Sequence, residues 1–482
     1  MRHAFLAAAA AACVLAAAPS ASANGRFPAS NALYFSPSNP QLIVLRTTFG
    51  ILPSTDYGTT WTWLCEDALG LPPTSNEDPT LGLTKNDTLV VGLSFALEIS
   101  PDTGCSWTTI GGGLTHQLVK DIVVRPDSPD AVLAVTSTYG PDAGADGGGG
   151  YAQQVYSSTN DGTSWTSIGT IDPSATVTTI EVAATDPQRI YVSAFRGEGA
   201  TRTTSIFTSK NAGQSWTETK TPFDPSTESA VYIAAVDPGN ANLLYIRSSG
   251  ASRLVVSKDG AQTFSVAYSM PSGDEMEGFA LSADGSKVYV GGPNTGLYVA
   301  PSSTLAFTQK STIHVQCLAT HGADLWACSD EPSGFVAGVS QNDGSSFTPR
   351  LHLSTISGPT HCAPATTSGA ICTTTDEDAE VPYNPFGSLC LNLGSCYGLD
   401  AGPEQPLSAA CVDAGACGST GSSGGSSGGS GSDASTPGDA GAKPSAGKSG
   451  SCGLSVVGGG GAASALLAGG LALLALHRRR RR

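Results

Sequence analysis

Short runs of alternating apolar and polar residues recur through residues 30–350, and turn sequences separate them. One group of four such runs covers residues 119–124, 131–136, 153–157 and 164–168. Alternation with a period of two, together with frequent β-branched residues, is typical of half-buried strands. The pattern therefore predicts antiparallel units of four strands joined by tight turns.

Six further segments have the features of the second strand in such a unit. Turn sequences such as Ser38-Asn39-Pro40 precede these segments and favour a reversal of the chain. The expected second strands are 41–46, 88–93, 189–195, 243–247, 287–291 and 324–329. With the strand at 131–136 they indicate seven units.

An eight-residue pattern repeats before the fourth strand of each unit, and its clearest copy is residues 158–165, STNDGTSW. Six copies have Asp or Asn at the third position and Trp or Phe at the eighth, and a decayed seventh copy, 300–307, ends at Phe307. These third and eighth residues are Asp56 and Trp61, Asp102 and Trp107, Asn160 and Trp165, Asn211 and Trp216, Asp259 and Phe264, and Asn342 and Phe347.

The spacing of the eighth-position aromatic residues decides the fold class. They lie 40 to 58 residues apart, a period that is typical of propeller blades with four short strands. We therefore expect an all-β protein with a seven-bladed β-propeller of four-stranded antiparallel blades.

The residue types of this octet suit a hairpin turn. An Asp or Asn accepts hydrogen bonds from backbone N–H groups just ahead of it, and Gly tolerates positive φ. The octet resembles the Asp-box (BNR) repeat of sialidases, some endoglucanases and photosystem assembly factors, over roughly residues 30–350. The resemblance implies that the Asp and Asn residues are structural and lie away from the substrate face.

The two ends of the chain indicate export. Residues 1–23 combine Arg2, an apolar run and the cleavage sequence Ala21-Ser22-Ala23, as in a secretory signal peptide. At the other end, Cys452 precedes a Gly, Ala and Leu run over 454–476 and an arginine block. This order resembles the myxobacterial C-terminal sorting tail, which implies cleavage near Cys452 by a dedicated sorting protease. An uncut transmembrane tail anchor is the alternative.

Both alternatives place the propeller outside the cytoplasm, at the cell surface, on the outer membrane or free in the medium. Nucleic acid is not an expected partner, because the formal net charge is -16. The chain is expected to be a monomer without a cofactor. The expected domains are a signal peptide (1–23), the propeller (24–355), a Cys-rich disulfide module (356–418), a disordered Gly/Ser/Ala linker (419–450) and the sorting tail (451–482).

Ten of the 12 cysteines remain once Cys13 of the leader and Cys452 of the tail are set aside. An even number in an exported chain predicts disulfides, and a zinc site would need a Cys-x-x-Cys with a matching second pair. The expected pairs are Cys317 with Cys328 across a hairpin, Cys65 with Cys105 across adjacent blades, and, from proximity alone, Cys362 with Cys372, Cys390 with Cys396, and Cys411 with Cys417.

Candidate functional residues are expected on the face opposite the octet turns. Paired carboxylates would suit glycoside hydrolysis, and clustered arginines would suit a carboxylated sugar. Solvated loops and plain surface charges are the alternative explanation for each cluster. The candidates are the acids Glu66, Asp67, Asp274, Glu275 and Glu277, the arginines Arg196, Arg202, Arg247 and Arg253, Glu198, and the Gly-rich loop 139–150.

No catalytic motif stands out. The Arg-Ile-Pro motif of sialidases is not matched by Arg26-Phe27-Pro28, and the acidic run 376–380 lacks the alternating ligands of a calcium loop. The sequence therefore favours a non-catalytic binding or adhesion module for a glycan or a surface protein, without a metal. An extracellular glycoside hydrolase, sialidase-like or endoglucanase-like, is the alternative, and a scaffold or assembly factor is a third possibility.

Overall fold

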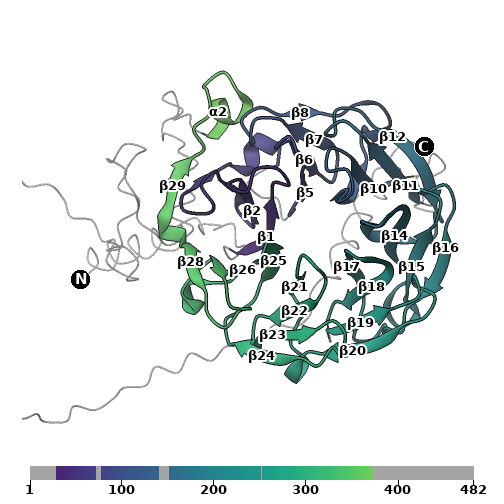
Figure 1. The fold of residues 1–482 in the computed structure, drawn as a ribbon. Coiled ribbons are helices and arrows are strands. Elements are labelled where there is room, and N and C mark those ends of the chain that lie inside the picture. Colours follow the sequence, from purple (N-terminus) through teal and green to yellow (C-terminus); the bar gives the residue numbers. More distant parts are fainter. Residues whose placement is uncertain (1–28, 72–76, 140–150, 251, 373–482) are drawn as a thin grey trace, which may run out of the picture. The chain divides into compact units, whose positions relative to one another are not determined.

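The computed structural model describes residues 29–71, 77–139, 151–250 and 252–372. The chain divides into two units, 1–418 and 419–482, and every described residue lies in the first. Within that unit, seven antiparallel sheets are arranged as the blades of a β-propeller (Figure 1). The expected fold class is confirmed, whereas the proposed transmembrane tail lies outside the described residues.

The strands of each blade follow one another in sequence from the centre outward. The innermost strands are β1 (Ser30–Phe35), β5 (Thr80–Leu83), β9 (Leu118–Val124), β13 (Thr176–Ala183), β17 (Val231–Asp237), β21 (Gly278–Leu281) and β25 (Cys317–His321). The second strands are β2 (Ile43–Thr47), β6 (Leu89–Gly92), β10 (Val132–Tyr139), β14 (Asp186–Arg196), β18 (Asn240–Ser248), β22 (Lys287–Gly292) and β26 (Asp324–Cys328).

The outer half of each blade carries the octet turn between its two strands. The third strands are β3 (Gly50–Ser54), β7 (Leu97–Ser100), β11 (Tyr151–Ser158), β15 (Thr203–Ser209), β19 (Arg253–Ser257), β23 (Gly296–Pro301) and β27 (Ala337–Ser340). The outermost strands are β4 (Trp61–Trp63), β8 (Thr108–Thr109), β12 (Thr166–Ile171), β16 (Thr217–Lys220), β20 (Ser265–Ser269), β24 (Thr308–Ser311) and β28 (Thr348–Leu351).

Short helices lie in the connections. They are η1 (Glu66–Leu69), η2 (Gly112–Leu114), η3 (Gly199–Thr201), η4 (Pro271–Gly273), η5 (Glu331–Ser333), η6 (Leu353–Thr355) and α2 (Thr367–Cys372). The core lies between the blades, where apolar residues of neighbouring sheets pack together. Leu133 and Val155 of the third blade, for example, share one buried cluster with Val177 and Val192 of the fourth. Removing this apolar surface from water drives the blades together.

The six complete octets fold into one hydrogen-bonded turn. In residues 158–165, the Ser158 hydroxyl donates to Asn160 Oδ1 (2.9 Å) and accepts from the Gly162 N–H (3.0 Å), and the Ser164 N–H donates to Asn160 Oδ1 (3.1 Å). The same three bonds recur in the other five copies. The fourth and fifth positions both have positive φ, although the fourth is often not Gly.

The decayed copy keeps the turn but lacks these side-chain bonds. In 300–307, the Pro301 carbonyl accepts from the N–H groups of Thr304 and Leu305. Positions 302–305 offer no Asp or Asn, so this turn is closed by backbone bonds together with one bond from the Ala306 N–H to the Thr304 hydroxyl (3.4 Å). The packing of the blades therefore tolerates the loss of one octet.

The aromatic residue that closes the octet differs in burial from copy to copy. Trp61 is 1% exposed, and its indole N–H donates to the carbonyls of Gly58 (3.0 Å) and Arg350 (3.0 Å). Trp165 makes the corresponding bond to the Gly162 carbonyl (2.7 Å) but is only half-buried. Trp61 therefore buries more of its side chain than Trp165, although the two residues occupy the same position in the repeat.

After the last blade, the chain returns to the first blade. Strand β29 (Ile356–Pro359) pairs in parallel with β4 on the outer edge of the first blade. Cys372, at the end of α2, forms a disulfide with Cys65, and Cys362 forms one with Cys105 of the second blade. We call residues 356–372 the C-terminal clasp, because they fasten the end of the propeller to its first two blades.

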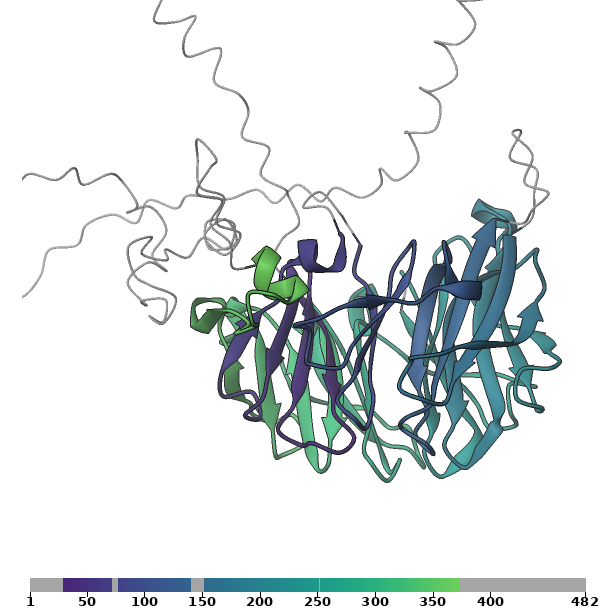
Figure 2. The ribbon, with the colours of Figure 1, turned by 90° about the horizontal axis from the view of Figure 1, so that it is seen from above.

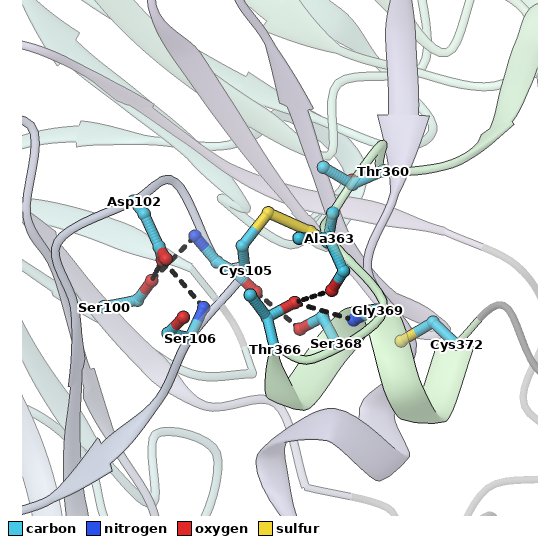
Figure 3. Close-up of a disulfide and its surroundings, with 12 residues drawn as sticks. Ser100, Asp102, Cys105, Ser106, Thr360, Ala363, Thr366, Ser368, Gly369 and Cys372 are labelled. Atoms are coloured by element: carbon cyan, nitrogen blue, oxygen red, sulfur yellow. Dashed lines mark hydrogen bonds between the residues drawn. A yellow bond between two sulfur atoms is a disulfide. The ribbon is translucent and has the colours of Figure 1, made fainter.

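Figure 3 shows how α2 of the clasp is held beside the second octet. The Ser368 N–H donates to the Cys105 carbonyl (3.0 Å), and the Ser368 hydroxyl donates to the Gly104 carbonyl (2.5 Å). The Trp107 indole N–H also donates to the Ser368 hydroxyl (3.2 Å). In Figure 2, α2 (green) lies beside η1 (purple) on one face of the propeller.

These pairings correct part of the sequence analysis. The expected bond between Cys317 and Cys328 is confirmed, because β25 and β26 pair these two residues directly. The expected bonds between Cys65 and Cys105 and between Cys362 and Cys372 are wrong. Strand β29 brings the clasp against two blades at once, so each of its cysteines meets a partner more than 250 residues away. Cys390, Cys396, Cys411 and Cys417 lie outside the described residues.

Candidate functional site

A cavity of about 740 Å³ opens among the innermost strands of the first five blades. Its rim includes Glu77, Asp78 and Ser94, which lie in connections at the opposite ends of the strands from the octet turns. We call it the channel pocket. It is lined by Tyr34, Arg46, Glu77, Asp78, Thr80, Gly92, Ser94, Leu118, Val119, Lys120, Asp121, Thr178, Thr179 and Tyr232.

Asp121 joins three innermost strands in this pocket. Its carboxylate accepts hydrogen bonds from the Ile180 N–H of β13 (2.9 Å), the Thr80 hydroxyl of β5 (3.1 Å) and the Ile122 N–H of its own strand (3.0 Å). Burial nevertheless raises the pKa of Asp121 to about 6, because desolvation disfavours the charged form more than these donors favour it. Through its hydrogen bonds with Ile180 and Thr80, Asp121 connects its own blade to the two neighbouring blades.

Glu181 lies on β13, one residue after the Ile180 N–H that binds Asp121. Burial and the neighbouring Asp121 charge raise the pKa of Glu181 to about 8. Among the described residues, no donor makes a hydrogen bond to its carboxyl group. The protonated, uncharged form of Glu181 consequently predominates at neutral pH.

Two cations line the same pocket. Arg46 donates from Nε to Asn31 Oδ1 (2.7 Å) and from Nη1 to the Pro79 carbonyl (2.9 Å), both neutral acceptors. Lys120 occupies a bulge in β9, and burial lowers the pKa of its ammonium group. Within the described part of the chain, no carboxylate lies within 4.0 Å of Lys120.

Three of the four arginines singled out from the sequence are bound within the protein. Arg196 pairs with Asp172 and Glu218, and Arg253 pairs with Glu228. Arg202 donates to the Ser229 carbonyl (2.8 Å) and lies over the Phe195 ring at 4.4 Å. They do not form a common arginine cluster.

Arg247 lies nearer the channel pocket than the other three arginines. Its guanidinium lies 5.1 Å from the centre of the Tyr232 ring, which lines that pocket. It also donates to the Met276 carbonyl (2.7 Å), and burial lowers its pKa. Sequence reasoning therefore named one arginine at the edge of the pocket and missed Arg46.

The acids singled out from the sequence have different roles. Asp274 accepts four hydrogen bonds from Asn294 and Thr295, and although burial opposes them, these bonds lower its pKa. Burial, followed by the charge of Glu275, raises the pKa of Glu277. Glu66 and Asp67 begin η1, and Glu198 precedes η3. The Gly-rich loop, apart from Tyr139, lies outside the described residues.

Sequence reasoning missed the channel residues because it searched the loops. Lys120 and Asp121 interrupt the apolar strand LVKDIVV, and Glu181 interrupts TVTTIEVA. Ionisable residues inside an apolar strand pattern are the signal that could have identified them, since burial of such groups is costly without a specific role.

Two further classes of site were searched in the described residues. No group of three or more His, Cys, Asp or Glu side chains there could hold a metal ion. No helix in that part of the chain has the length and apolar character needed to cross a membrane. The lining of the channel pocket offers a ligand hydrogen-bonding groups, two cations, the carboxyl groups of three acids and two aromatic rings.

One family model matches part of the chain. Residues 153–289 match the family model described as Sortilin-Vps10, "Sortilin, neurotensin receptor 3". No curated protein matches the chain. Because the family match covers less than half of the chain, it describes a similarity of this stretch.

Solved structures with similar folds include YCF48 from Cyanidioschyzon merolae, at 14% identity over 62% of this chain and 92% of that one, with a TM-score of 0.44. A GH74 enzyme from Niastella koreensis has 16% identity over 66% and 71%, with a TM-score of 0.30. The Cps50 (Swd1) β-propeller domain of Myceliophteria thermophila has 12% identity over 64% and 96%, with a TM-score of 0.42. At these values the similarities do not bear on function.

Proposed function

We propose that this chain is an exported binding module, displayed at the cell surface, that holds its ligand in the channel pocket without catalysing a reaction. The ligand is a glycan or a surface protein. The observation that carries the proposal is the channel pocket itself, a cavity of about 740 Å³ built from five blades. A concave site with a few polar groups is the usual form of a ligand site.

The roles of the charged residues support binding over catalysis. The carboxylate of Asp274 and the guanidinium groups of Arg196 and Arg253 are held by partners in the protein. A glycosidase needs two carboxyl groups that face one scissile bond. The acids on the loops, which the sequence suggested for this role, form two groups in different connections, Glu66 and Asp67 between β4 and β5, and Asp274, Glu275 and Glu277 between β20 and β21.

The proposed location rests on the sequence of the two ends, the leader at 1–23 and the sorting tail at 451–482. The three disulfides are consistent with it, because disulfides persist in oxidising compartments. We likewise propose that the octets are Asp-box repeats with a structural role, which their shared hydrogen bonds support.

One observation favours an extracellular glycoside hydrolase as a second candidate. Glu181 is protonated at neutral pH and lies close enough to Asp121 for the two charges to interact. Pairs of carboxyl groups with separated pKa values are the pattern of acid and base in glycosidases. In this alternative Glu181 would donate a proton to the leaving group.

The test is a screen of the purified full chain against polysaccharides, scoring bound ligand and released sugar together. Ser94→Trp places a large side chain at the exposed rim of the channel pocket, and Thr217→Trp is the matched control on an exposed outermost strand. We expect Ser94→Trp alone to abolish binding. Binding that survives Ser94→Trp would refute the channel site, and sugar release that Glu181→Gln abolishes would establish the hydrolase.

A further inference from the structure

We infer that the ligand of the channel pocket is an acidic glycan, and that the Lys120 ammonium and the Arg46 guanidinium bind its anionic group. This inference rests on the proposed function, because it names the ligand class of the same pocket. It comes from a difference between the acids and the cations that line the pocket. Among the described residues, Asp121 and Glu77 accept hydrogen bonds from the protein. No carboxylate there lies within 4.0 Å of Lys120 or Arg46, although the charge of Asp121 acts on Arg46 from a longer distance.

Two acids that line the pocket, Asp121 and Glu77, accept hydrogen bonds that hold their carboxylates. Asp121 accepts three hydrogen bonds, including one from the Ile180 N–H. Glu77 accepts from both the N–H (2.5 Å) and the hydroxyl (2.6 Å) of Ser94. Each of these carboxylates is therefore held by the protein and is a poor partner for a cationic ligand.

The cations are less well satisfied. Lys120 is half-buried and has no carboxylate partner among the described residues. Arg46 uses Nε and Nη1 for neutral oxygens, and its Nη2 makes no hydrogen bond to the described residues. Partial burial of a cation without a counterion costs free energy that an anionic ligand would recover.

The neighbouring Glu181 does not cancel this positive character. Its carboxyl group is mostly protonated at pH 7, since its pKa is raised to about 8. The formal net charge of the whole chain is -16, so anions are repelled at long range and the pocket must act within a Debye length of about 8 Å. Attraction confined to the pocket favours an anionic group on a larger neutral molecule.

The rest of the lining suits a sugar chain. The rings of Tyr34 and Tyr232 line the pocket from the first and fifth blades, and such rings offer both an apolar face and a hydroxyl group. The pocket is large enough for a chain end of two or three sugar units on the usual scale of ligand sites. A uronate or a sulfated sugar has the required combination of charge and hydroxyl groups.

Calorimetry on the full chain, with three matched probes, tests the inference. The probes are a disaccharide that ends in glucuronate, the same disaccharide ending in glucose, and acetate. We expect the glucuronate probe to bind roughly tenfold or more tightly than the neutral one, as for one hydrogen bond to a charged group. Acetate is expected to bind far more weakly than the glucuronate probe.

Two lysine variants connect the preference to the pocket. Lys120→Gln should reduce the preference for glucuronate several-fold, because only Arg46 then remains to bind the anionic group, whereas Lys258→Gln, at an exposed lysine on an octet turn, should keep it. A sulfated probe that competes with glucuronate in the wild type, but not in Lys120→Gln, would extend the site to sulfated glycans.

The failures are distinguishable. Equal binding of the glucuronate and glucose probes overturns the acidic-glycan inference and leaves the binding module intact. A preference that Lys120→Gln does not reduce overturns the assignment of the anionic group to Lys120. Acetate that binds as tightly as the disaccharide overturns the glycan part. If the Ser94→Trp screen finds no ligand in the channel pocket, the proposed function is wrong, and this inference is wrong as well.

Discussion

Carboxyl groups occur in two regions of this propeller, the octet turns and the channel pocket, and their pKa values shift in opposite directions. In the turns, hydrogen bonds from Thr263 lower the pKa of Asp259 to about 2. At the channel, burial raises the pKa of Asp121 to about 6 and that of Glu181 to about 8. The same chemical group is therefore a stronger acid in the turns and a weaker acid at the channel, where Glu181 is mostly protonated at pH 7 and Asp121 remains mostly charged.

The difference teaches how far each region depends on the whole fold. An octet turn supplies its own donors within eight residues and remains solvated, as at Asp259. The environment of Asp121 requires β5 and β13 from neighbouring blades. Substitutions in the two regions should therefore separate the part of the free energy of unfolding that comes from local contacts from the part that comes from the assembled ring.

The largest effect is expected from the one turn aromatic that is fully buried. Trp61→Ala should lower the free energy of unfolding by about 3 to 5 kcal/mol, because it leaves a cavity against the last blade and removes two hydrogen bonds. The loss in free energy of unfolding can be measured by urea denaturation. Trp165→Ala, at a half-buried position, is the control and should cost less; equal losses would contradict the difference in burial.

A smaller loss is expected in the channel. Asp121→Ala leaves the buried Ile180 N–H without its acceptor, which should cost about 1 to 3 kcal/mol. Asp127→Ala removes an exposed carboxylate from a salt bridge with Arg125 and serves as the control. If both variants unfold at the same urea concentration, Asp121 does not join the blades.

The pH dependence of stability tests the raised pKa of Glu181. The folded protein keeps this proton up to about pH 8, whereas the unfolded chain loses it near the ordinary value of 4.5. The folded state thus binds more protons between these values, and its stability should fall as pH rises from about 4.5 to about 8. Glu181→Gln should flatten this part of the profile in urea unfolding. An unchanged profile would mean that Glu181 is ionised in the folded state.

The smallest effect is expected from Asp259→Asn. Three turns already use Asn at this position with the same hydrogen bonds, so the melting temperature at pH 7 should not change measurably. At low pH the wild type should lose stability as Asp259 is protonated towards pH 2, and the variant should not. A large loss at pH 7 would show that the charge itself is needed in the turn.

Much of the fold could be predicted because its signals are local. The octets place a turn and a strand start within eight residues, and six copies together with the decayed seventh give the number of blades. Even the decayed copy at 300–307 was recognisable from its spacing, although its hydrogen bonds were not. The candidate site was harder to predict: Arg247 was named, whereas Arg46, Lys120, Asp121 and Glu181 were not.

By itself, the sequence determined the blade repeat, the turn chemistry and the hairpin disulfide between Cys317 and Cys328, since each depends on residues that are close in the chain. The tertiary structure alone decided that Cys65 meets Cys372, that Cys105 meets Cys362, and that Asp121 lies among three strands. The physical reason is closure of the ring. Closure brings together residues that are far apart in the chain, and their burial at the channel shifts their pKa values. The residues next to them in the sequence do not reveal this burial.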